Sequence, residues 1–182
     1  MKALFSTIIA TVLFFNFAIA QSGKESSHVV TLKVPTVALV NVVSTNPINL
    51  ELVKPTTAGA WFDKVTDANS WLNVSSLVVA NATRTISVEA DDNVPDGLNL
   101  TVTADKVSSK GNLGDVAEAP IVLDGLGSGT LISEIKTGYT ETGTLKGFQL
   151  TYELSVDNTD DTSIEALVSA NTEITVTYTI SE

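Results

Sequence analysis

The sequence predicts an all-β fold, an antiparallel β-sandwich of the Ig-like or jelly-roll type with about 8–10 short strands. Residues 148–156 alternate strictly between apolar and polar side chains, as a strand with one buried and one solvated face does. Residues 172–181 repeat this alternation at the C-terminus. No stretch of 10–15 residues shows the 3.6-residue periodicity of an amphipathic helix. Turn residues recur roughly every 8–12 positions.

Composition indicates one globular domain with an acidic surface. The chain has 182 residues, of which 43% are hydrophobic, enough for a core of its own. Its formal net charge of −11 repels phosphate backbones and anionic lipid headgroups, so we expect no nucleic-acid or membrane partner. The sequence contains no cysteine, so burial and sheet hydrogen bonds must stabilise the fold without disulfides.

The N-terminus has the pattern of a secretory signal peptide. Lys2 precedes an apolar run over residues 3–17, and Ala18 and Ala20 provide the small residues of a cleavage site before Gln21. The run is shorter than the roughly 20 residues that span a bilayer. We therefore expect a signal peptide over 1–20, a flexible leader over 21–27 and one β-sandwich domain over 28–182. The protein is expected to be exported from a bacterium, to the periplasm, the cell surface or the medium.

The N-terminal half is expected to begin with a strand over residues 28–34 that Pro35 interrupts, because proline cannot donate to a sheet ladder. Further strands are expected at residues 36–43, 48–53, 71–80, 84–90 and 98–104. Pro95 and Gly97 make residues 91–97 a turn, which predicts a hairpin between the last two of these strands. Residues 60–70 fit either a helical turn or a loop.

The C-terminal half is expected to begin with a long connection over residues 105–119. Four strands are expected after it, at residues 120–124, 130–135, 148–156 and 172–181. Residues 157–161 form a loop, and residues 164–168 fit one helical turn or a short strand.

The residues of common catalytic centres are missing or badly placed. A serine nucleophile needs a base beside it, and the single histidine, His28, begins the first expected strand. Ser128 lies in a glycine turn without the flanking pattern of a nucleophile elbow. One histidine and no cysteine cannot form a His- or Cys-based metal site. We therefore expect a protein that is not an enzyme and binds no cofactor.

Two acidic turns leave calcium binding open, since calcium takes oxygen ligands alone. The residues concerned are Asp91, Asp92 and Asp96 in one turn and Asp157, Asp160 and Asp161 in the other. Neither turn has the spacing of a calcium-binding loop, and turn formation is the simpler interpretation of these residues. Paired carboxylates for glycoside hydrolysis are not indicated, because 21 acidic residues bring some pairs together by chance.

Three aromatic residues are candidates for contact with a ligand such as a sugar ring. Trp61 and Tyr139 lie in loop-like stretches, and we name them as candidate ligand contacts. Trp71 begins an expected strand, and for it we favour packing in the core.

The ends of the chain resemble small exported bacterial proteins of the pilin or fimbrial-subunit type. The likeness consists of a signal peptide, a β-rich segment over 28–40 broken by Pro35, and a final alternating strand with Tyr178. This resemblance implies an incomplete Ig-like sandwich that the N-terminal strand of another subunit completes by β-strand addition. The pairing face would be Val30, Leu32 and Val34, or else Val29 with Thr31 and Lys33.

These observations lead to two functional hypotheses. The first is an exported, non-enzymatic structural or adhesive protein that assembles with copies of itself or with related subunits through a sheet edge. The alternative is a β-sandwich module that binds a carbohydrate or another ligand.

Overall fold

A computed structural model describes residues 25–169 and 171–181 of the chain. The predicted signal peptide and its cleavage between Ala20 and Gln21 lie outside the described residues. The chain forms two units, with the boundary between Lys33 and Val34. In the first unit, residues 25–33 contain neither helix nor strand, and every one of them is exposed.

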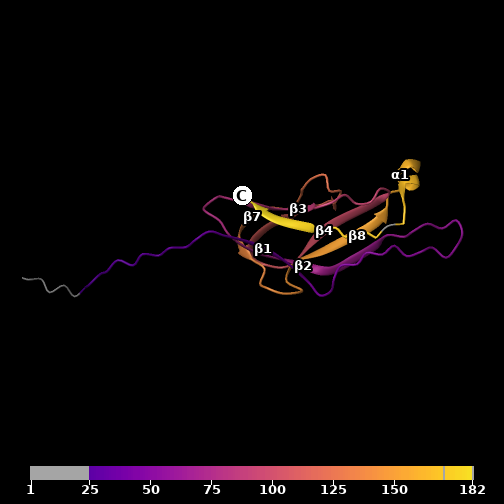
Figure 1. Ribbon diagram of the computed structural model, residues 1–182. Helices are drawn as coiled ribbons and strands as arrows, with labels where there is room; N and C mark the ends of the chain where they lie inside the picture. Colours follow the sequence, from indigo (N-terminus) through magenta and orange to yellow (C-terminus); the bar gives the residue numbers. More distant parts are fainter. Residues whose placement is uncertain (1–24, 170, 182) are drawn as a thin grey trace, which may run out of the picture. The chain divides into compact units, whose positions relative to one another are not determined.

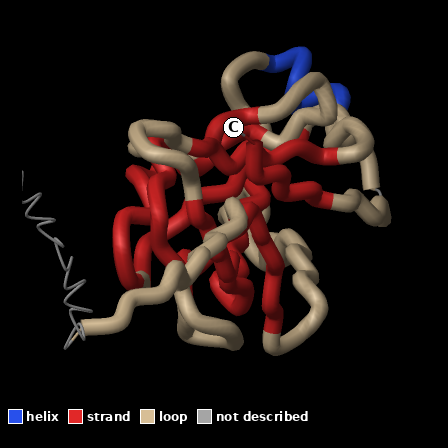
Figure 2. The backbone as a smooth tube through the Cα atoms, turned by 90° about the vertical axis from the view of Figure 1, so that its left-hand side faces the viewer, coloured by secondary structure: helices blue, strands red, loops and turns tan. Residues whose placement is uncertain are grey.

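The second unit holds the secondary structure (Figure 1). Its elements are β1 (Val37–Ser44), β2 (Val65–Leu77), β3 (Arg84–Ala90), β4 (Leu98–Ser108), β5 (Lys110–Val116), β6 (Ile121–Val122), β7 (Gly129–Tyr139), β8 (Gly147–Val156), α1 (Asp161–Ala166) and β9 (Val176–Ser181). Figure 2 shows that strands make up most of this unit and that the short helix lies at its margin. The prediction of an all-β chain is therefore confirmed.

The nine strands among the described residues belong to one antiparallel sheet. Its order is β6-β4-β8-β2-β7-β3-β9, with β1 paired to β2 and β5 paired to β7 off this path. β2 is the longest strand and joins both halves, because it pairs with β8 over Val65–Leu72 and with β7 at Ser75 and Ser76. The predicted strand at 148–156 is confirmed as β8, which lies between β4 and β2.

The predicted hairpin between residues 84–90 and 98–104 is wrong. Both strands exist, and the turn between them contains Gly97 at φ +82° as expected. However, β3 pairs with β7 and β9, whereas β4 pairs with β6 and β8. Alternation along a strand defines which face is buried, but the hydrogen-bonding edge is the same for any partner, so the pattern does not select the neighbour.

Several expected boundaries also differ from the structure. Residues 28–34 and 48–53 form no strand; the second stretch lies between Pro47 and Pro55, which cannot donate to a ladder. Residues 65–70, expected as a helical turn or loop, begin β2. The expected connection at 105–119 contains the end of β4 and all of β5. Of the two alternatives for 164–168, the helical turn is the one formed: α1 starts at the Asp160 cap, whose side chain accepts from the Ser163 amide at 2.7 Å.

The core is made of aliphatic side chains from six strands and of Leu123, which follows β6, with one tryptophan, one phenylalanine and one tyrosine. The largest fully buried members are Phe148, Leu72, Ile86, Leu113, Leu123, Leu131, Ile132, Ile135 and Leu150. β2 is buried on both faces between Ser70 and Val74, and Trp71 is only 5% exposed. The preference for Trp71 as a core residue over a ligand contact is therefore confirmed.

Candidate functional site

A groove of about 650 Å³, lined mainly by apolar residues, lies in the part of the chain that the structure describes. Its walls come from the end of β1 and the chain after it, the starts of β4 and β9, and the end of β8. The apolar lining residues are Val42, Ile48, Leu50, Val94, Pro95, Leu98, Leu100, Tyr152, Leu154, Ile174, Val176 and Tyr178. These strands meet here because the inward positions of each carry aliphatic or aromatic side chains. The groove can therefore hold an apolar group, and its walls carry none of the paired acids or bases that catalysis requires.

Two tyrosines on different strands are among the residues that line the groove. The hydroxyls of Tyr152 on β8 and Tyr178 on β9 are 2.7 Å apart and hydrogen-bonded to each other. Burial raises the pKa of both phenols, and for Tyr152 the hydrogen bond from Tyr178 opposes part of this effect. Both phenols are therefore neutral over the physiological pH range and form a hydrogen-bonded pair beside the apolar residues of the groove.

A segment before β9 forms one side of the groove. Asn171, Thr172 and Glu173 are exposed and line its rim. The segment is fastened to the end of β3 by a reciprocal pair of bonds: the Thr175 amide donates to the Asp91 carboxylate at 2.7 Å, and the Asp91 amide donates to the Thr175 carbonyl at 3.0 Å. The bonds from Thr175 lower the pKa of the Asp91 carboxyl, so this attachment is present at neutral pH.

The predicted strand-exchange residues lie in the extended segment before β1. Val30, Leu32 and Val34 are 66%, 84% and 74% exposed, and Val29 on the opposite face is 93% exposed. No strand of the described chain pairs with this segment. Four large aliphatic side chains are thus exposed within six residues, which is unusual for a soluble surface.

Trp61 and Tyr139, the candidate ligand contacts, are not brought together. Trp61 precedes the start of β2, is half exposed and packs edge-on against Phe62, with ring centroids 5.3 Å apart. Tyr139 pairs with Ser75 near the other end of β2 and lies under the Lys110 ammonium at 5.7 Å. Ser75 follows Val65, the first residue of β2, by ten positions, which corresponds to about 33 Å of strand. One sugar ring cannot contact both residues.

The remaining polar candidates form no recognisable reaction centre. His28 is exposed in the segment before β1. Within residues 25–169 and 171–181, no group of three or more histidine, cysteine, aspartate or glutamate side chains is arranged to hold a metal ion. In the acidic turns, Asp157 and Asp160 instead accept bonds from Thr159 and Ser163, the role expected of turn and cap residues.

No known protein family, curated protein or solved structure matches this chain. The features of the molecule that bear on its function are therefore the groove, the exposed segment before β1 and the distribution of charge.

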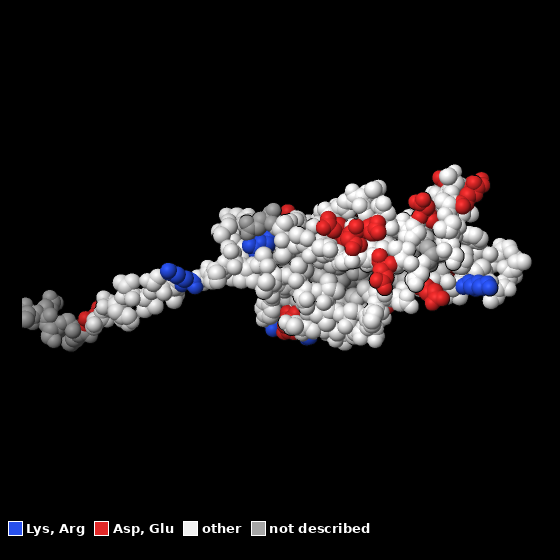
Figure 3. Space-filling model, in the orientation of Figure 1, with Lys and Arg blue, Asp and Glu red and all other residues white. Residues whose placement is uncertain are grey.

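Charge is divided unevenly along the chain. Residues 21–34 contain two lysines and one glutamate, a formal charge of +1, whereas residues 35–182 contain seven basic and twenty acidic residues, a formal charge of −13. Figure 3 shows acidic side chains spread over one face of the β unit and gathered around α1. The described helices include none long and apolar enough to cross a bilayer.

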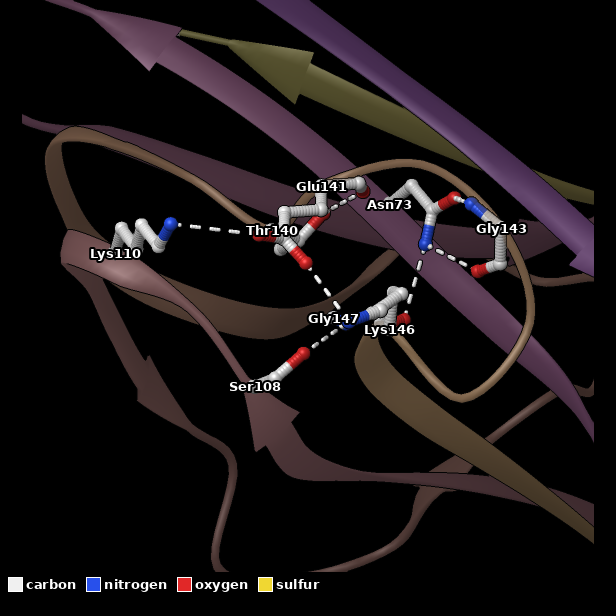
Figure 4. A network of polar contacts seen from close by, with 8 residues as sticks. All are labelled: Asn73, Ser108, Lys110, Thr140, Glu141, Gly143, Lys146 and Gly147. Carbon is white, nitrogen blue, oxygen red and sulfur yellow. Dashed lines mark hydrogen bonds and ion pairs between the residues drawn. The ribbon is translucent and has the colours of Figure 1, made fainter.

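A polar network that the sequence did not indicate holds the connection between β7 and β8 (Figure 4). Asn73 is 7% exposed; its amide nitrogen donates to the carbonyls of Gly143 and Lys146 at 3.1 and 3.0 Å, and its oxygen accepts from the Gly143 amide at 2.7 Å. We call these three hydrogen bonds the Asn73 clamp. Beside the clamp, the ammonium groups of Lys146 and Lys110 lie 2.8 and 3.4 Å from the Glu141 carboxylate. Every polar group of Asn73 is thus used within the fold, which indicates a structural role.

Proposed function

We propose that this protein is an exported, non-enzymatic structural or adhesive subunit that assembles by β-strand addition through its N-terminal segment. The observation that carries the proposal is the exposure of Val30, Leu32 and Val34, which are alternate residues of a segment that belongs to no strand. An alternating apolar segment without a ladder partner gains both main-chain hydrogen bonds and apolar burial when it joins a sheet edge. Burying three such side chains contributes roughly 1.5–3 kcal/mol each before ordering costs.

We further propose that the nine-stranded sheet closes into a two-layer sandwich, as assembly of this kind needs. Support comes from the bond between Tyr152 and Tyr178, because β8 and β9 are four places apart in the sheet order. Sandwiches of this type have edge strands, and here β1 and β9 each have a ladder partner on one side alone within the described chain. Those free edges are where another strand can be added.

The test compares two purified chains, one beginning at Gln21 and the other at Pro35. All of the buried apolar core lies between Trp71 and Tyr152, and the partly buried residues packed on it end at Ile180, so the shorter chain keeps the complete core. We expect light scattering after size-exclusion chromatography to show concentration-dependent oligomers for the longer chain and a monomer for the shorter one. A longer chain that stays monomeric at every concentration would refute assembly through this segment.

A second candidate function, glycan binding, is favoured by one observation. Trp61 is 50% exposed and rests edge-on against Phe62, so its outer face is available for stacking on a sugar ring. Affinity electrophoresis in soluble polysaccharides tests it. Retardation that is lost in Trp61→Ala and retained in Tyr139→Ala would support a site at Trp61, and equal mobility of all three proteins would exclude one.

A further inference from the structure

We infer that the groove beside β9 binds a small organic cation, a molecule with an apolar body and an amine that is protonated at neutral pH. This binding does not depend on the assembly proposed above. Three properties of the groove determine the class of ligand: its size, the residues of its walls and the charge of the chain around it.

The size of the groove suits a small molecule. Its volume of about 650 Å³ lies within the roughly 300–1,000 Å³ of sites that hold small organic ligands. Apolar side chains from β1, β4, β8 and β9 converge on it, so an apolar group that enters is removed from water. Val42 and Ile48 on its walls are each 40% exposed, and covering them favours binding of the apolar body.

The walls carry one charged side chain, and its charge is negative. Glu173 is the only charged residue among those that line the groove, and it is exposed. Among the described residues, the ion pairs formed by lysine involve Glu141 and Glu153 and leave Glu173 to other cations. The neutral phenols of Tyr152 and Tyr178 add no second charge, and aromatic rings attract cations through their faces.

The chain around the groove is acidic over long stretches. Residues 147–182, which include β8 and β9, contain seven acidic residues and no lysine or arginine. Residues 85–104, which include the turn before β4, contain four acidic residues, and residues 37–53 contain one, again without a basic residue. This distribution attracts cations and repels carboxylates and phosphates. A fatty acid would place its carboxylate beside Glu173, whereas an amine at the same position is attracted.

The same residues determine the orientation of the ligand. An ammonium group among the aliphatic walls would be desolvated without a counter-ion, so it stays at the rim beside Glu173 while the apolar body enters. Asn171 and Thr172 lie on this rim and provide neutral oxygens that accept hydrogen bonds from an amine. The bonds between Thr175 and Asp91 fasten this segment to the end of β3, so the rim is held in place.

Three ligands with the same alkyl chain test the class of ligand. Isothermal titration calorimetry of the chain beginning at Gln21 compares decylamine, decanol and decanoate below the concentrations at which they aggregate. We expect decylamine to bind most tightly and decanoate most weakly, because the apolar body is common and only the head group differs. Added salt should weaken the binding of decylamine and leave that of decanol unchanged. Decanoate binding as tightly as decylamine would overturn the cationic class, and the absence of binding by all three would overturn the site.

A charge substitution tests the position of the amine. Glu173→Gln should weaken the binding of decylamine about 2–5-fold and leave that of decanol unchanged, because an exposed ion pair contributes modestly. The matched control is Glu165→Gln, which removes an exposed acid of α1 outside the groove and should change neither affinity. An equal loss in both variants would show that overall charge attracts the amine, and this result would overturn the assignment to the groove.

An apolar substitution tests the position of the body. Ile48→Gln should weaken the binding of decylamine and of decanol by about 3–10-fold, because it removes apolar surface from the wall. Leu126→Gln is the control, since Leu126 is 83% exposed and lies outside the groove. Urea unfolding of both variants verifies that they fold. Wild-type affinities in a folded Ile48→Gln variant would overturn the groove as the binding site.

Discussion

The hydroxyl of Tyr152 on β8 lies 2.7 Å from the hydroxyl of Tyr178 on β9, although the two strands are four places apart in the sheet. β8 is an interior strand and β9 ends the sheet order, so the sheet must bend for these side chains to meet. Each hydroxyl gives the other a hydrogen-bond partner within a mainly apolar wall. This pair therefore links an interior strand of the sheet to its last strand and contributes two residues to the groove.

The loss in free energy of unfolding per substitution is expected to be larger when one tyrosine of the pair is replaced than when both are replaced. Tyr178→Phe leaves the Tyr152 hydroxyl buried without its partner, which lowers the free energy of unfolding by about 1–3 kcal/mol. The double substitution Tyr152→Phe/Tyr178→Phe removes both polar groups and should cost less than the sum of the two single changes. Urea unfolding of the four proteins measures this coupling, and strictly additive losses would contradict a mutual bond.

The same pair predicts that stability falls at alkaline pH. The pKa values of Tyr152 and Tyr178 are raised in the folded protein by burial, whereas unfolded tyrosine titrates near pH 10. Above about pH 10 the unfolded chain releases protons that the folded chain retains, so the free energy of unfolding decreases as pH rises. Below pH 10 these two groups contribute no pH dependence.

Unfolding midpoints in urea between pH 8 and 12 test this expectation. The decline above pH 10 should be smaller in Tyr152→Phe/Tyr178→Phe than in the wild type. A double variant with an unchanged slope would show that the pair is not the cause.

Gly147 is expected to tolerate no side chain. It begins β8 at φ +80°, and a Cβ there would lie 2.2 Å from the Leu72 carbonyl oxygen on β2. Gly147→Ala therefore separates two paired strands as well as straining the backbone, and we expect a loss of at least about 2–3 kcal/mol or failure to fold. Gly127→Ala is the matched control, because a Cβ at Gly127 meets no atom within 4 Å. Thermal unfolding of both variants measures the difference.

Removing the Asn73 side chain is expected to release the connection between β7 and β8. Asn73→Ala leaves the Gly143 and Lys146 carbonyls and the Gly143 amide without their bonds, at a cost of about 1–3 kcal/mol. Amide hydrogen exchange should rise at Gly143 more than in β4. Asn46→Ala, whose side chain is exposed, is the control and should leave both measurements unchanged. Unaltered exchange at Gly143 in Asn73→Ala would refute the clamp.

Removal of residues 21–34 is expected to change assembly without changing the stability of the isolated β unit. The residues removed are exposed wherever the structure describes them, and none belongs to the core. The free energy of unfolding of the chain beginning at Pro35, measured in urea under dilute conditions, should therefore match that of the longer chain within about 0.5 kcal/mol. A large loss would indicate that the segment packs within its own chain.

Burial faces were predicted in part where the pattern was strictly periodic: in β8 the first three inward residues are buried, but Leu154 and Val156 are no more buried than the expected solvated face. Residues 148–156 became β8 with Phe148, Leu150 and Tyr152 buried, and the inward residues Ile86, Val88 and Ala90 of β3 are buried as expected. These two strands were therefore accessible from sequence, because period-two alternation is a local property, whereas the strands expected at 28–34 and 48–53 do not form and β5 was not expected. For residues 164–168, part of which belongs to α1, the sequence left two alternatives, one helical turn or a short strand.

The candidate site was not accessible in the same way. The inward faces at Leu98, Tyr152 and Tyr178 were each visible in the sequence, but their convergence in one groove depends on which strands are neighbours. The hairpin predicted between residues 84–90 and 98–104 was wrong for the same reason, since the sequence pattern does not identify neighbouring strands. The Asn73 clamp joins residues 70 or more positions apart, and asparagine in a strand carries no local mark of such a partner.

By itself the sequence determined an all-β chain, the buried face of its regular strands and an aliphatic, disulfide-free interior, because these depend on residue type and spacing along one strand. Only the tertiary structure decided that β8 lies between β4 and β2, that the hydroxyls of Tyr152 and Tyr178 meet, and that an apolar groove opens beside β9. The physical reason is that main-chain hydrogen bonds are chemically identical along every strand. The choice of partner is therefore made by the packing of the whole core.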